Sequence, residues 1–260
     1  LFGRNTPAGA VSVYSVKPDH EGTAFLQAEA GDYNLLSLQG AASFSAIDNV
    51  LAFRATGFGM QRDGTVSDVN LGDDKIADRD RWGLRLQALW TPNDDVSVHF
   101  IADASEIDEV CCGANTYKNN FEADGVPGKT GTDVIAEDIG ANVLLGENFY
   151  DRETAFSYLP ESTNEDVGLS MQVDWQTENF LLTSITAYRE FEAFDDVDSD
   201  WMDLDALQRT NEQEQNQFSQ ELRISNDYDR FNYVFGLYYF TQDLDTKRDT
   251  IAGVDTSALV

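Results

Sequence analysis

The sequence predicts an all-β protein, a transmembrane antiparallel up-and-down β-barrel of which about nine strands are visible. Three observations predict this class. Apolar and polar residues alternate with a period of two in many segments, and the links between these segments alternate between short and long. No apolar run approaches the roughly 18 residues of a membrane-spanning helix. A membrane location therefore requires a closed barrel, because only a barrel can otherwise satisfy its own backbone in lipid.

Each predicted strand has one apolar and one polar face. In the stretch RWGLRLQALW, Leu84 and Leu86 fall on one face, and Arg85 and Gln87 fall on the other. The segment 179–192 is β-prone, but the pattern does not assign its faces. The predicted strands lie near residues 23–31, 34–45, 49–61, 80–91, 95–105, 166–177, 180–191, 216–226 and 230–242.

The links between the strands distinguish the two sides of the predicted barrel. Four links are tight and rich in turn-forming residues, at 46–48, 92–94, 178–179 and 227–229. From the third strand onward, every other link is long, at about 61–80, 105–165 and 192–215. Outer-membrane barrels have short periplasmic turns and long external loops, so we expect the long links to face the outside.

The alternation also predicts which side chains contact lipid and which face the barrel lumen. Aromatic residues lie at the ends of several apolar bands, where interfacial girdles are expected. We expect Leu86→Arg to cost about 2–4 kcal/mol and Gln87→Arg to be tolerated. The lipid-facing set is Trp82, Leu84, Leu86, Val98, Phe100, Leu169 and Val173, and the lumen-facing set includes Arg85, Gln87, Ser170 and Gln172.

The first residues, LFGRNTPAGAVSVYSVKP, carry a more specific signal. Gly3, Arg4, Asn5 and Thr6 form a turn-like motif, Gly9 permits unusual backbone angles, and a valine-rich segment at 11–16 reads as a strand that Pro18 ends. This stretch resembles the C-terminal end of the plug domain of TonB-dependent outer-membrane receptors. The later segments DRDRWGLRLQALWTPNDDVSVHFIADASEID and NQFSQELRISNDYDRFNYVFGLYYF resemble strand pairs of the same family.

The resemblance implies a division of the chain and a function. Residues 1–20 would be the end of the plug, and residues 21–260 the N-terminal part of a barrel of about 22 strands with long external loops. The intact receptor would sit in the outer membrane of a Gram-negative bacterium, in contact with its lipid. It would take up a scarce small-molecule or metal-chelate substrate, such as a ferric siderophore or other iron complex, with energy from the TonB complex.

The same resemblance implies transport and no enzymatic activity or cofactor. The TonB-contacting segment would lie outside this stretch of sequence, and the residues that bind the substrate cannot be read from it. Polar side chains of the lumen would hold the plug and line the path. The lumen-facing candidates are Arg54, Arg85, Gln87, His99, Asp174, Glu221 and Arg223.

Two alternative functions belong to other classes. A passive porin-like channel shares the barrel but has no plug, and the GRNTPAGA stretch argues against it. A secreted soluble β-sandwich enzyme or adhesin also has alternating strands. Only two histidines occur, and nothing resembles a nucleophile elbow, so the sequence offers no catalytic site.

The net charge argues against nucleic acid as a partner, and the acidity of the long links has two possible explanations. The net charge of −30 argues against nucleic acid, which needs clustered Lys and Arg. The three long links hold 28 acidic and 7 basic residues. Such a negative outer face would favour cationic ligands and repel anionic ones, but adaptation to a saline habitat would produce the same pattern.

Two small groups of side chains are further candidate sites, one for a disulfide and one for a divalent cation. Cys111 and Cys112 are adjacent in the longest link, and their Cα atoms lie about 3.8 Å apart, below the usual range for a disulfide. A disulfide between them and a bond to a cysteine elsewhere are both open. Asp196, Asp198 and Asp200 have the spacing of calcium ligands, but Trp201 and Leu207 break the EF-hand pattern. A looser divalent-cation site and a solvated acidic loop both fit these three carboxylates.

Overall fold

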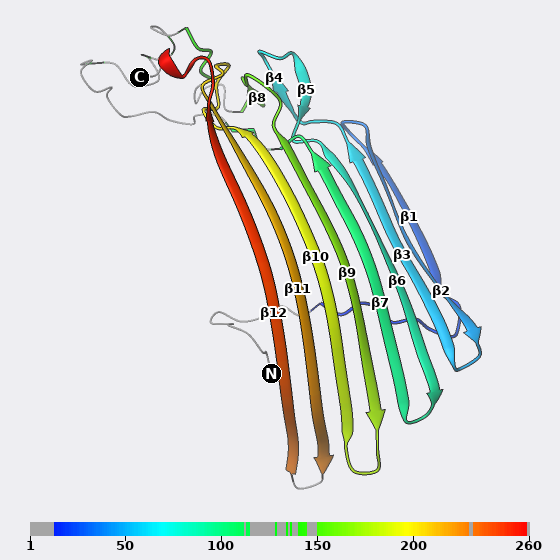
Figure 1. Ribbon diagram of the computed structural model, residues 1–260. Helices are drawn as coiled ribbons and strands as arrows, with labels where there is room; N and C mark the ends of the chain where they lie inside the picture. Colours follow the sequence, from blue (N-terminus) through cyan, green and yellow to red (C-terminus); the bar gives the residue numbers. More distant parts are fainter. Residues whose placement is uncertain are drawn as a thin grey trace.

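The computed structural model describes residues 13–111, 113–114, 140–144, 150–228 and 231–258, with isolated positions 128, 134 and 136. Its main element is a single nine-stranded antiparallel sheet in which each strand lies beside the next along the chain (Figure 1). The predicted all-β meander is therefore confirmed. The sheet comprises β1 (Ala24–Gly31), β2 (Leu35–Ile47), β3 (Leu51–Arg62), β6 (Arg79–Asn93), β7 (Val96–Glu109), β9 (Glu161–Gln176), β10 (Leu181–Asp198), β11 (Leu207–Tyr228) and β12 (Phe231–Ala252).

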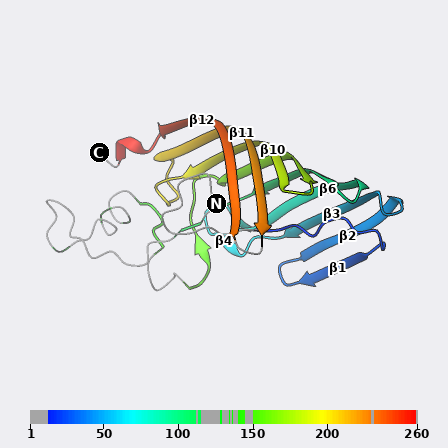
Figure 2. The ribbon, with the colours of Figure 1, turned by 90° about the horizontal axis from the view of Figure 1, so that it is seen from below.

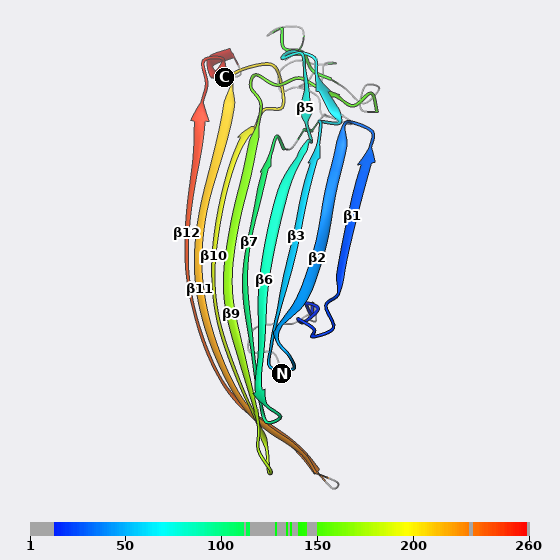
Figure 3. The same ribbon diagram turned by 90° about the vertical axis from the view of Figure 1, so that its right-hand side faces the viewer.

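The sheet is an open, curved wall. Among the described residues, β1 pairs only with β2 and β12 pairs only with β11, so both edges lack a neighbour. Seen from below, the strands bend around an inner side, which the N-terminal segment crosses (Figure 2). The side view shows the same bend along the length of the strands (Figure 3). An incomplete wall is the predicted form of a part of a larger barrel.

The two faces of the wall reverse the exposure pattern of a soluble protein. On one face apolar side chains are exposed, as in the cross-strand row Leu86, Ala102, Leu169 and Tyr188, where Leu86 is 49% exposed. On the other face polar side chains are half-buried or buried, and Gln87 is only 3% exposed. We call these the apolar face and the polar face. Exposed apolar and covered polar groups are expected of a wall that has lipid on one side.

The apolar face has a defined height. On β6 the alternating apolar residues run from Trp82 to Trp90, and on β9 from Val167 to Trp175. This length matches the 9–11 residues with which a tilted strand crosses a membrane. A row of carboxylates follows directly at the end of the wall that carries the long links. It consists of Glu106, Glu165, Glu192, Glu214 and Asp245 on five neighbouring strands.

The third long link was predicted wrongly. Strand β10 continues to Asp198 and β11 begins at Leu207, so most of the predicted loop 192–215 is strand, and the link is only 199–206. Beyond the apolar band β11 is polar on both faces from Gln208 to Gln217, and in β10 apolar residues fall on both faces, with Phe194 on one and Val197 on the other. The apolar alternation that reveals a strand in the sequence therefore disappears where the strands still pair.

The segments at the end with long links form a small structure of their own. Strands β4 (Val66–Asp68), β5 (Asp73–Ile76) and β8 (Glu153–Thr154) make a three-stranded sheet, which the sequence did not predict. Around it lies a small core that includes Phe156, Ile76, Pro160 and Ala206. We call the segments 63–78, 150–160 and 199–206 the external cap.

The N-terminal segment differs from its prediction in one respect. The expected strand at 11–16 is not present in its described part, residues 13–16, which follow no regular secondary structure. No helix in the described part of the chain is long and apolar enough to cross a membrane.

Candidate functional site

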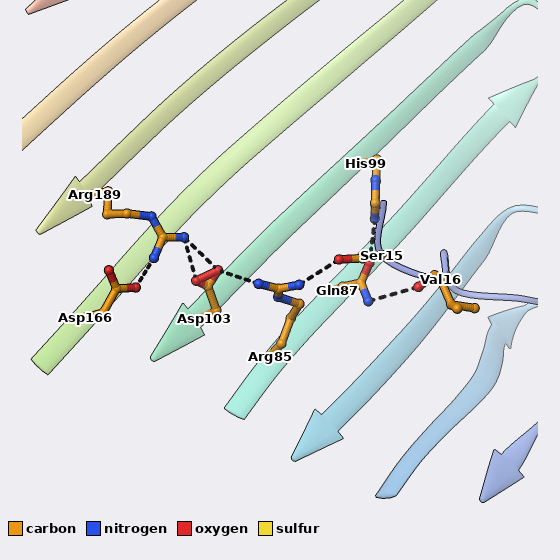
Figure 4. Close-up of polar contacts among 8 residues, drawn as sticks. All are labelled: Ser15, Val16, Arg85, Gln87, His99, Asp103, Asp166 and Arg189. Carbon is orange, nitrogen blue, oxygen red and sulfur yellow. Dashed lines mark hydrogen bonds and ion pairs between the residues drawn. The ribbon is translucent and has the colours of Figure 1, made fainter. Parts of the chain in front are cut away.

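A row of charged side chains crosses the polar face of four neighbouring strands. Cross-strand register places Arg85 of β6 beside Asp103 of β7, then Gly168 of β9, then Arg189 of β10. Asp103, which is 14% exposed, pairs with both arginines: its carboxylate lies 3.4 Å from Arg85 Nη2 and 2.9 Å from Arg189 Nη2. Arg189 also pairs with Asp166 (Figure 4). Two arginines and two carboxylates thus form one compensated cluster.

Gly168 makes this cluster possible. A Cβ at this position would lie 2.9 Å from Asp103 Oδ2 and closer still to the Arg189 guanidinium. The glycine therefore leaves the space through which Arg189 reaches Asp103 across an intervening strand. A larger residue would displace the guanidinium from its two carboxylate partners.

The N-terminal segment is bound to the same face. Arg85 Nη1 donates a hydrogen bond to Ser15 Oγ at 2.6 Å, and Gln87 Nε2 donates to the main-chain oxygen of Val16 at 3.1 Å. His99 Nε2 lies 3.0 Å from Gln87 Oε1. Because the oxygen of an amide can only accept, His99 must carry its proton on Nε2 for this contact. Figure 4 shows these side chains pointing from β6 and β7 toward Ser15 and Val16.

The contact continues onto β2 and β3. His20 Nδ1 lies 3.0 Å from Ser45 Oγ, and Pro18 is buried. Under the segment, Arg54 donates to Ser43 Oγ at 3.0 Å, and both side chains are buried. Buried polar groups need partners, so these hydrogen bonds allow a polar wall to be covered by the chain.

The remaining lumen-facing candidates also lie on the polar face. Asp174 accepts hydrogen bonds from Gln172 at 2.6 Å and from Thr183 at 2.7 Å. Glu221 and Arg223 pair with each other at 3.1 Å on β11. The motif residues Gly3, Arg4, Asn5, Thr6 and Gly9 lie outside the described residues.

Sequence reasoning found only Arg85 among the four charged residues of the cluster. Asp103, Asp166, Gly168 and Arg189 were not among the candidates. The available signal was charge on the polar face within a strand, which Asp103 shows beside His99. For Arg189 this signal was absent, because the faces of its segment could not be assigned.

Buried aspartates hold the external cap together. Asp68 accepts from the main-chain nitrogens of Phe156 and Leu71, each at 2.8 Å. Asp198, which is 1% exposed, accepts from the main-chain nitrogen and the hydroxyl of Ser157, each at 2.9 Å. Burial, and then the neighbouring Asp200, raise the pKa of Asp198 to about 6. Burial and the hydrogen bond to Asp196 likewise raise the pKa of Tyr158.

The three carboxylates considered for a divalent cation serve different partners. Asp196 accepts from Tyr158 and Gln208, Asp198 from Ser157, and Asp200 from main-chain nitrogens. No group of three or more His, Cys, Asp or Glu side chains in the described ranges could hold a metal ion. The divalent-cation hypothesis therefore gains no support. Cys111 is disulfide-bonded, and the other cysteine of the chain, Cys112, lies outside the described residues.

Comparison with known proteins identifies the architecture. No protein-family model matches the sequence. The ferric yersiniabactin uptake receptor FyuA from Yersinia pestis matches with a TM-score of 0.71 and 15% identity, over 92% of this chain and 33% of the receptor. The siderophore receptor PiuA from Acinetobacter baumannii matches with a TM-score of 0.63 and 11% identity, over 94% of this chain and 35% of the receptor.

A third similar structure belongs to a transporter of another substrate. The copper transporter OprC matches with a TM-score of 0.59 and 10% identity, over 91% of this chain and 30% of the transporter. The chain thus spans about one third of the length of these proteins, which are receptors and transporters and not enzymes. Its nine-stranded wall has the fold of part of the barrel of TonB-dependent outer-membrane receptors.

Proposed function

We propose that this chain is the end of the plug, at 1–20, and the first part of the barrel wall, at 21–260, of a receptor in the outer membrane of a Gram-negative bacterium. The receptor binds a scarce substrate from outside and imports it with energy from the TonB complex. One observation carries this proposal: a wall with an exposed apolar face holds a polar-bonded segment of its own chain against its inner face.

The segment bears on the choice between a receptor and an open channel. A passive pore needs an unobstructed lumen, whereas residues 15–20 cover part of the polar face. The soluble sandwich has less support, because the nine strands form a single sheet whose apolar side chains are exposed. In a sandwich those side chains would be packed between two sheets.

The proposal also covers the identity of the substrate and which end of the wall faces each side of the membrane. We propose a ferric siderophore or other iron complex as the substrate, in keeping with the named ligands of two of the three similar proteins. The short turns after β2, β6 and β9 face the periplasm, and the external cap faces the outside. This arrangement places the row from Glu106 to Asp245 just beyond the lipid on the outer side.

The experiment compares uptake with and without TonB. The full-length receptor that contains this chain is expressed in a Gram-negative host without its own iron receptors, and uptake of radioactive iron is measured from a panel of chelates. We expect saturable uptake that is lost when TonB is deleted. Uptake that persists without TonB would indicate a passive channel instead.

A further inference from the structure

The outer parts of β9, β11 and β12 carry different polar groups on their two faces, while the inner face of β10 between them presents Phe191, Ala193 and Asp195. On β11, Gln217 lies opposite Arg189 and therefore on the polar face. The register continues without a bulge, so Gln213 and Gln215 share this face, while Glu212 and Glu214 lie on the opposite face. We call the inner set the amide wall: Asn164, Gln213, Gln215, Gln217 and Gln242. The outward set consists of Glu165, Glu190, Glu192, Glu212, Glu214, Asp243 and Asp245.

On β11 this distribution places glutamine on the inner face and glutamate on the outer face, although the two side chains have nearly the same size. Glutamine and glutamate differ little in shape, so packing does not explain why one occupies the inner face and the other the outer face. Only two carboxylates occur on the described inner face in this region, Asp166 and Asp195. Asp166 is paired with Arg189, and Asp195 accepts a hydrogen bond from Ser162 at 2.7 Å. The inner surface is therefore close to electrically neutral in a chain of net charge −30.

Aromatic rings adjoin the amide wall. Tyr238 and Phe240 lie on the polar face of β12 with ring centroids 6.3 Å apart and an interplanar angle of 14°. Together with Gln217 of the amide wall, Ser219 and the Asp103–Arg189 ion pair, they line a hollow of about 220 Å³. Amides that can both donate and accept, beside flat apolar rings, suit a ligand that presents hydroxyl or amide groups.

The arginines next to the amide wall are already compensated. Arg85 and Arg189 share Asp103, and Arg189 also pairs with Asp166. Two further arginines, Arg209 and Arg248, lie at the outer end of the wall, where Arg248 donates to Asn211 Oδ1 at 3.0 Å. Recognition of a polyanion normally uses arginines whose donors are available to it, and here those nearest the hollow are engaged by carboxylates.

The surroundings also disfavour an anion. The links and outer strands that lead to the amide wall contain most of the acidic residues, and their field repels anions at a distance. We propose that the amide wall contacts an electrically neutral ligand that presents hydroxyl or amide groups, and that it discriminates against polyanionic chelates. An uncharged ferric hydroxamate and an uncharged oligosaccharide both have this chemistry. The inference rests on the proposed TonB-dependent uptake: the hydroxamate would specify the iron complex proposed above, whereas the oligosaccharide would replace it.

The test uses the full-length receptor and three probes: an uncharged ferric tris-hydroxamate, a trianionic ferric tris-catecholate and an uncharged linear oligosaccharide. Binding to the purified receptor is measured by calorimetry, and uptake is measured in cells with and without TonB. The test variant, Gln213→Glu with Gln215→Glu, replaces amide donors on the inner face without a cation directly opposite either position. The control, Asn216→Asp, makes the same amide-to-carboxylate change at the residue after Gln215, on the outer face.

We expect at least one neutral probe to bind, the catecholate to bind at least tenfold more weakly, and the double variant to weaken neutral binding about five- to tenfold. The control should bind as the unchanged receptor does. The two neutral probes distinguish a chelate from a saccharide. Binding of no neutral probe, or catecholate binding as tight as theirs, would overturn the inference. Loss of TonB dependence with neutral binding intact would instead count against the proposed function.

Discussion

Gln87 of β6 donates a hydrogen bond to the main-chain oxygen of Val16, 71 residues earlier in the chain, at 3.1 Å. Its carboxamide oxygen is at the same time 3.0 Å from His99 Nε2. A residue that the sequence places simply on a polar strand face is thus almost completely buried between the wall and the N-terminal segment. The polar face is a binding surface for the chain itself.

This burial changes the expected effect of Gln87→Arg. The sequence alone predicts that an arginine here is tolerated. The structure predicts a loss of about 2–3 kcal/mol of unfolding free energy, because a charge would be buried in the place of two hydrogen bonds. Gln172→Arg is the matched control, since Gln172 lies on the same face beside Asp174, which can pair with an arginine. Urea unfolding of the full-length receptor in detergent measures both, and equal costs would contradict the burial of Gln87.

Leu86 tests the opposite face. Leu86→Arg places a charge in the middle of the apolar band, between Trp82 and Trp90, and should cost about 2–4 kcal/mol in a bilayer. Ser170→Arg lies at a similar height on the polar face and should cost much less. Unfolding from lipid vesicles measures the difference. A larger cost for Ser170→Arg would mean that the two faces are assigned the wrong way round.

Gly168→Ala tests the charged cluster. The added methyl group would collide with Asp103 and Arg189, so we expect a loss of about 1–3 kcal/mol. Gly59→Ala on β3 is the control, because a Cβ there would meet nothing within 4 Å. Thermal unfolding followed by the gel mobility of the folded barrel compares the two variants. If both alanines have the same small effect, Arg189 does not depend on the space at Gly168.

Asp198 predicts a pH dependence of the external cap. Its pKa in the folded cap, about 6, is above the ordinary aspartate value of 3.8. Protonated Asp198 should therefore contribute fully to the stability of the cap below about pH 4. This contribution should be lost as the pH rises through 6, where Asp198 ionises. Proteolysis of the cap by an acid-tolerant protease, from pH 4 to 8, should be slower at the acidic end. The Asp198→Asn variant should remove most of this pH dependence, and an unchanged profile would assign it to another group.

The strands could be predicted where the two faces of the wall meet different surroundings. In β6 and β9 an exposed apolar face and a covered polar face produce an alternation that is visible in the residues themselves. Beyond the band, Glu212 and Gln213 are both polar, so the pairing of β10 with β11 in this region leaves no such trace. It depends instead on hydrogen bonds between main-chain groups, which any residue can make.

The site could be predicted in part for the same reason. Arg85, Gln87 and His99 stand out as polar residues in alternating strands, but the partners Ser15 and Val16 are set by how the N-terminal segment crosses the wall. Gly168 contributes the space that a side chain would fill, and no pattern of side chains in the sequence predicts such a space. The external cap was missed because Phe156 and Ser157 of one link are brought together with Asp68 of another link and Asp198 at the end of β10.

The most direct test of this account is a cross-link between the N-terminal segment and the wall. In the full-length receptor, Ser15→Cys and Arg85→Cys replace two residues whose side chains are in contact, Arg85 Nη1 lying 2.6 Å from Ser15 Oγ. A short reducible cross-linker is applied to intact cells, and a pair of Ser15→Cys with Ser219→Cys on β11 serves as the control. We predict that the first pair is linked in the folded receptor and the control pair is not. Failure of the first pair to link in a correctly folded receptor would contradict the claim that this wall holds the segment on its inner face.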